Sequence, residues 1–92
     1  MAPALFFFLM HHEAFSQPIG GLGSGLSCLF VNPVGKLFRV HCPFRVVCRQ
    51  ASPPYQVGDI AAVIRVGSST KHGVLYKIDH QYFVHHYFAL HV

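Results

Sequence analysis

Acidic side chains are scarce in this 92-residue chain, which has three Asp and Glu residues against seven Lys and Arg. A Ser or Cys nucleophile needs a histidine and an orienting carboxylate, and only Glu13, Asp59 and Asp79 could supply the carboxylate. Asp59 belongs to a predicted turn, and so short a chain leaves little room for a ligand pocket. We therefore expect no enzymatic activity, no catalytic residue and no cofactor.

Several motifs are missing as well. The three cysteines lack the CxxC spacing of zinc knuckles and redox motifs, which predicts free thiols. Residues 20–25 are rich in glycine but do not end in the Gly-Lys-Ser/Thr of a P-loop. The apolar residues 5–10 fall short of the roughly 20 needed to cross a bilayer, and no basic start precedes them as in a secretory signal. We expect a cytoplasmic protein without a membrane span.

Histidine, by contrast, is abundant, with eight in the chain and four between residues 80 and 91. On a strand, His85 and His86 would point to opposite faces, and His85 and His91 would lie about 20 Å apart. The favoured interpretation is half-buried side chains without a metal. A metal site that brings His41 or His72 alongside them is the alternative left open.

The chain divides in two by charge. Residues 1–35 carry only Glu13, whereas residues 36–92 carry all seven basic residues and two Asp. The glycine-rich residues 20–25 predict a linker, because glycine loses the most backbone entropy on ordering. We therefore expect a loosely ordered N-terminal segment over residues 1–35 and a small β domain over residues 36–92.

Period-two alternation runs through the second part and predicts strands. Pro43 should mark an edge strand or a bulge. Residues 60–66 should form the central strand, residues 79–81 should close a hairpin, and residues 82–92 should form the last strand. The expected shared faces are Phe38, Val40 and Cys42; Phe44, Val46 and Cys48; Ile60, Ala62, Ile64 and Val66; and Val74, Tyr76 and Ile78.

Two short motifs carry a resemblance: Tyr55-Gln-Val-Gly-Asp59 before a strand, and Leu75-Tyr76-Lys77-Ile78. With them, residues 38–90 resemble the SH3-like small β-barrels that include Tudor and KOW modules. The predicted fold is all-β, a small SH3-like barrel or a strongly bent antiparallel sheet of four to five strands. Gly58 should have a positive φ and be the least replaceable residue. The resemblance implies a domain of a kind that binds peptides or nucleic acids.

A basic face is the strongest candidate for a functional surface. Its predicted residues are Arg39, Arg45, Arg49, Arg65 and Lys77, interleaved with Tyr76, Tyr82, Phe83 and Tyr87 as stacking platforms. The expected partner is nucleic acid or an acidic protein, bound across Arg39, Arg45 and Arg49. Ordinary solvation of exposed charge is the alternative explanation of this pattern.

A different class of function would explain the 52% of hydrophobic residues. A homo-oligomer could cover apolar side chains that a single-layer sheet would leave wet. The candidates for that interface are Val47, Leu75, Phe83 and Tyr87.

Overall fold

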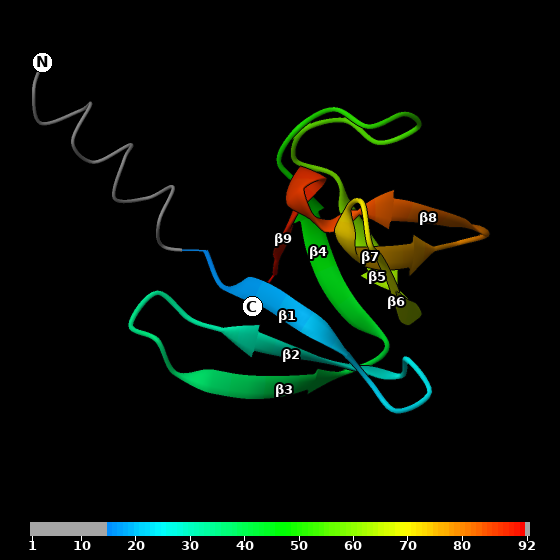
Figure 1. Cartoon of the computed structure of the whole chain (residues 1–92). Helices are drawn as coiled ribbons and strands as arrows, with labels where there is room; N and C mark the ends of the chain where they lie inside the picture. The colour runs from blue at the N-terminus through cyan, green and yellow to red at the C-terminus, as the bar shows by residue number, and fades with distance from the viewer. Residues whose placement is uncertain (1–14, 92) are drawn as a thin grey trace, which may run out of the picture.

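The computed structural model describes residues 15–91, and these residues form an all-β fold (Figure 1). The strands are β1 (Gln17–Leu22), β2 (Ser27–Val31), β3 (Leu37–His41), β4 (Phe44–Cys48), β5 (Ile60–Val63), β6 (Arg65–Ser69), β7 (Gly73–Ile78), β8 (Gln81–Val84) and β9 (Phe88–Leu90). A single 3-10 turn, η1 (His85–Tyr87), separates β8 from β9. The all-β prediction is confirmed.

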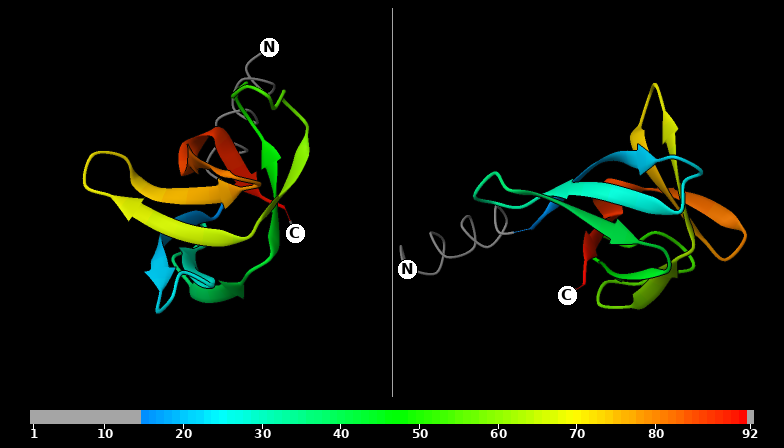
Figure 2. Two further views of the ribbon diagram at one scale, coloured as in Figure 1. Left: turned by 90° about the vertical axis from the view of Figure 1, so that its right-hand side faces the viewer. Right: turned by 90° about the horizontal axis from the view of Figure 1, so that it is seen from below.

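The strands form three small antiparallel sheets, with the orders β1-β2-β3, β5-β4-β9 and β6-β7-β8. The stretch from Ile60 to Ser69 contributes to two of them, because it bends at Ile64 between β5 and β6. Figure 2 shows this change of direction, which carries the chain from one sheet into the next. The described strands make strongly bent sheets and do not pair into one closed barrel.

One hydrophobic core joins the three sheets. Phe30 of β2 meets Phe44 of β4 edge to face at 5.7 Å between ring centroids, and Phe44 meets Tyr76 of β7 in the same way. A second aromatic group brings Tyr55, Phe83 and Phe88 together. Edge-to-face pairs of this kind stabilise a core beyond the area that they bury.

The linker predicted over residues 20–25 is wrong, because β1 runs through Gly20 and Gly21 and pairs with β2. The β1–β2 turn then packs against β6, where the Val66 amide donates to the Gly25 carbonyl at 2.7 Å. A Cβ on Gly25 would lie 2.6 Å from the Val66 carbonyl oxygen. Gly21 and Gly25 are therefore needed for close approach to β6.

The domain boundary predicted after residue 35 does not fit the described part of the chain. β2 lies before that boundary and pairs along its whole length with β3, which lies after it. Cys28 and Phe30 of β2 are fully buried in the core. The prediction for residues 1–14 falls outside the described residues.

The face predicted for residues 60–66 is also wrong. Ile60 and Ile64 are exposed, whereas Ala61 and Val63 are buried. The bend at Ile64 then shifts the alternation, so that Val66 returns to the core. β5 is an edge strand, and β4 holds the centre of its sheet.

The single last strand predicted over residues 82–92 is interrupted by η1. Phe83 before η1 and Phe88 after it are both buried in the core. In a continuous strand they would point to opposite faces, because they lie an odd number of residues apart. Phe83 is therefore no part of an exposed aromatic surface. Val47, Leu75 and Tyr87, the other candidates for such a surface, are half-buried.

Other alternations are confirmed. Phe44, Val46 and Cys48 of β4 are buried together, and so are the core-facing residues of β7, Val74, Tyr76 and Ile78. The hairpin between β7 and β8 turns at Asp79 and His80, with Asp79 at φ 58°. Gly58 has φ +96°, as its Gly-Asp turn predicted.

Candidate anion-binding surface

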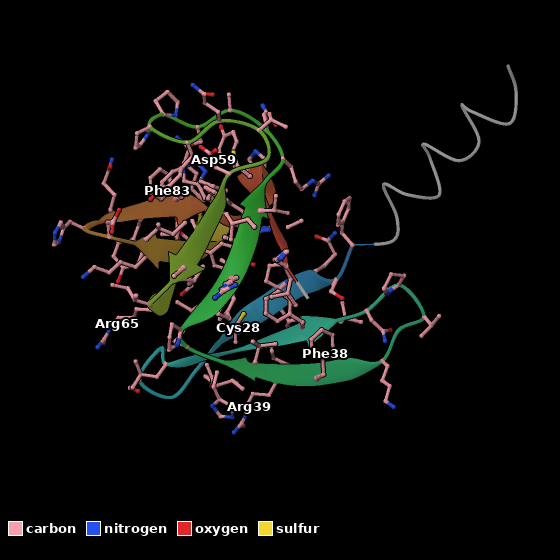
Figure 3. All side chains as sticks on the ribbon, turned by 180° about the vertical axis from the view of Figure 1, so that it is seen from behind. Cys28, Phe38, Arg39, Asp59, Arg65 and Phe83 are labelled. Carbon is pink, nitrogen blue, oxygen red and sulfur yellow. The ribbon has the colours of Figure 1, made fainter. Side chains whose placement is uncertain are left out.

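The five predicted basic residues are spread over the three sheets. Arg39 is exposed on β3, and Arg45 is exposed on β4. Arg49 follows β4 and places its guanidinium 4.6 Å from the centre of the Phe15 ring. Figure 3 shows Arg39 and Arg65 projecting outward from separate sheets.

A shared face for Arg39, Arg45 and Arg49 on adjoining strands is not what the structure contains. β3 and β4 are consecutive along the chain but belong to different sheets and do not pair with each other. Pro43 stands between them and has no amide hydrogen to continue a ladder. The chain therefore leaves the first sheet at this point and begins another.

Two of the five residues are brought together. Arg65 of β6 stands directly opposite Lys77 of β7, and Lys77 stands directly opposite Tyr82 of β8. We call these three residues the cationic row. The neighbouring pair, Val66 and Tyr76, is buried on the other side of the sheet, so the cationic row lies on the outer face.

Each member of the cationic row has a defined contact. The Arg65 guanidinium donates through Nη1 to the Ser24 carbonyl at 3.2 Å. The Lys77 Nζ lies 5.9 Å from the centre of the Tyr82 ring, within the range of a cation–π interaction. Arg65 and Tyr82 are exposed, and Lys77 is half-buried.

The carboxylates of the described residues are engaged elsewhere. Asp59 accepts a hydrogen bond from the Gln56 amide at 2.8 Å. Asp79 accepts one from the Tyr55 hydroxyl at 3.2 Å. Like charges directly opposite on neighbouring strands are destabilising, so Arg65 and Lys77 form a concentration of positive charge that an anion would relieve.

The cysteine and histidine side chains are arranged differently from a reactive or metal-binding centre. Burial raises the pKa of the Cys28 thiol from 9.0 to about 11, which keeps it protonated and unreactive at neutral pH. Burial, and secondarily the neighbouring His86, lowers the pKa of His85. Within residues 15–91, no three His, Cys, Asp or Glu side chains gather as metal ligands would.

Residues 15–91 enclose no pocket. They also contain no helix of the length and apolarity that crossing a membrane requires. Comparison of the chain with protein-family models, with curated proteins and with solved structures found no match.

Part of the cationic row could have been derived from the sequence. A two-residue turn at Asp79 and His80 places Lys77 opposite Tyr82, because pairing counts outward from the turn. The pairing of Arg65 with Lys77 could not be derived. It depends on where β6 ends and β7 begins, and the polar residues between them carry no signal for that boundary.

Proposed function

We propose that this protein is a small SH3-like binding module that contacts nucleic acid through the phosphates, at the cationic row. The fold part of this proposal is supported by the chain path over residues 44–90. The stretch that bends at Ile64 contributes to two three-stranded sheets. β9, the last strand, pairs with β4, which is the first strand of residues 44–90. A cytoplasmic location fits the three free cysteines.

The observation that carries the functional part is the direct opposition of Arg65 and Lys77 on an outer sheet face. A phosphate backbone supplies closely spaced negative charges, and its neutralisation by Lys and Arg is the main source of affinity for nucleic acids. An excess of five positive charges in residues 36–92 adds a long-range attraction of the same sign.

The alternative is assembly of this chain with itself. Ile60 on β5, Ile64 directly after it and Val57 before it are exposed over 53, 45 and 66% of their surfaces. An apolar edge strand of this kind is a site where a second chain can add. This alternative predicts a dimer that does not bind nucleic acid.

Binding of a labelled single strand of about 12 nucleotides, a length within the usual site size, tests the proposal. We expect binding by the full-length protein to weaken steeply as salt rises from about 50 to about 200 mM. Arg65→Gln with Lys77→Gln should weaken binding on the order of tenfold at low salt and make the salt dependence shallower.

The matched control is Lys36→Gln with Arg39→Gln, which removes the same charge from β3 and the turn before it and should have a much smaller effect. Equal loss in the two double variants would contradict the assignment to β6–β8. A size-exclusion profile of a dimer, unchanged by oligonucleotide at any salt, would contradict nucleic-acid binding and favour assembly.

A further inference from the structure

The outer face of β6–β8 carries an aromatic ring in an unusual position. A Cβ built on Gly67 of β6 would lie 3.1 Å from Cε1 of Tyr82, and 3.7 and 3.8 Å from its Cδ1 and Cζ. The Tyr82 ring therefore crosses from β8 over β7 and rests on the backbone of β6.

Gly67 is needed here for space alone. It is absent from the glycines with positive φ, so its backbone is one that other residues adopt. A side chain at this position would push against the ring, since 3.1 Å is closer than ordinary van der Waals contact. The missing side chain thus makes a seat that fixes the ring against the sheet.

The seated ring remains available to a ligand. Tyr82 is 48% exposed, whereas its neighbour Phe83 is buried in the core. A ring held in place on one side loses little further freedom when a planar group stacks on it, and this preorganisation favours binding.

The positive charges beside the ring indicate which kind of molecule would carry the stacked planar group. Lys77 lies beside the ring and Arg65 lies one strand further along the same row. Residues directly opposite on paired strands have Cβ atoms about 5 Å apart. A ligand stacked on Tyr82 would therefore place its adjoining backbone beside two positive charges.

We infer that Tyr82, seated on Gly67 and flanked by Lys77 and Arg65, is a stacking platform for an unpaired base of single-stranded nucleic acid. The inference rests on the proposed function and narrows it to one class of ligand. An aromatic side chain can stack on any unpaired base, whereas bases in a duplex are covered by their neighbours. An acidic peptide would satisfy the charges but would leave the ring unused.

Three probes separate stacking from charge. They are a single-stranded oligonucleotide, the corresponding duplex, and inorganic polyphosphate, which has the phosphates but no bases. Tyr82→Leu should weaken binding of the single strand at least about fivefold, because one stacked base contributes measurably by substitution. It should leave binding of polyphosphate and the slope of affinity against salt unchanged.

Two further variants test the geometry. Tyr82→Phe keeps the ring and should bind the single strand like the parent, within about twofold. Gly67→Ala keeps Tyr82 but disturbs its seat, and should lose part of the same affinity. Thermal unfolding of each variant checks that the fold persists, and Gly67→Ala, compared with Tyr82→Phe, preserves the test if Tyr82→Leu unfolds.

The outcomes distinguish the inference from the function beneath it. If the parent binds no oligonucleotide, both fail. If Arg65→Gln with Lys77→Gln loses binding while Tyr82→Leu keeps it, phosphate binding stands and stacking is overturned. A preference for the duplex, or an equal loss of polyphosphate binding in Tyr82→Leu, would also overturn stacking.

Discussion

The sheet β1-β2-β3 and the two sheets built from β4–β9 reach the same core by different means. β4–β9 interlock through aromatic side chains, with Phe44 on Tyr76 and Phe83 on Phe88. The first sheet contributes one buried aromatic ring, Phe30, and also docks through backbone, since the β1–β2 turn hydrogen bonds to β6 and a side chain on Gly25 would collide with Val66. The contact among β4–β9 depends on side chains that are present, whereas the docking of the first sheet also depends on the absence of a side chain at Gly25.

Phe30 is the side chain that joins the two regions, so its removal should have the largest effect. It is fully buried on β2, stacks on Phe38 and meets Phe44 edge to face. Phe30→Ala should lower the free energy of unfolding by about 3–5 kcal/mol, the usual cost of emptying an aromatic site. Chemical denaturation followed by far-UV circular dichroism measures it.

Leu37→Ala is the control for Phe30→Ala, because Leu37 lies on β3 of the same sheet and is 55% exposed. It should change stability by about 0.5 kcal/mol or less. A second, separate transition in Phe30→Ala, or no change in the main one, would show that the first sheet is an independent appendage.

The two glycine turns give the next comparison. Gly58 and Gly25 both have positive φ, at +96° and +85°, but a Cβ on Gly58 meets nothing within 4 Å. Gly58→Ala should therefore cost only backbone strain, about 1–3 kcal/mol. Gly25→Ala adds a collision with the Val66 carbonyl and should cost about 1–3 kcal/mol more.

Thermal or chemical unfolding of Gly25→Ala and Gly58→Ala, measured side by side, decides this point. Gly25, and not Gly58, is then the less replaceable residue. Equal losses would mean that the β1–β2 turn can move away from β6 without cost, and that the first sheet is docked more loosely than the 2.7 Å hydrogen bond from Val66 to Gly25 indicates.

These features explain how far the sequence could predict the fold. Alternation identified the buried face of β4 because the charged Arg45 marks its other face and the charged Arg49 follows at its end. It failed at residues 60–64, which are apolar at every position, so neither parity is marked as polar. The bend at Ile64 has no glycine or proline to announce it.

The glycine-rich residues 20–25 were the other failure, and the reason is tertiary. Their conformation is stabilised by β6, which lies some forty residues later in the chain. For the candidate surface, charge alone identified Arg65 and Lys77 but could not separate them from Arg39 and Arg45. The seat of Tyr82 on Gly67 depends on two strands that are not consecutive, β6 and β8.

The smallest expected effect is a pH dependence carried by the first sheet. Burial raises the pKa of Cys28 on β2 to about 11, against 9.0 when unperturbed. Because the folded state holds this proton more tightly, its contribution to stability is complete below pH 9 and is lost as pH rises toward 11. At pH 10 the loss is about 1 kcal/mol.

The parent should therefore lose more stability between pH 8 and pH 10 than Cys28→Ala does, whatever the two proteins' stabilities at pH 8. Urea denaturation at both pH values provides the four free energies of unfolding, and the ionisation of groups away from Cys28 cancels in the double difference. An equal loss in the two proteins would mean that the Cys28 thiol ionises in the folded protein as it does in the unfolded chain. Solvent would then reach Cys28, although its side chain has zero exposure in the structure.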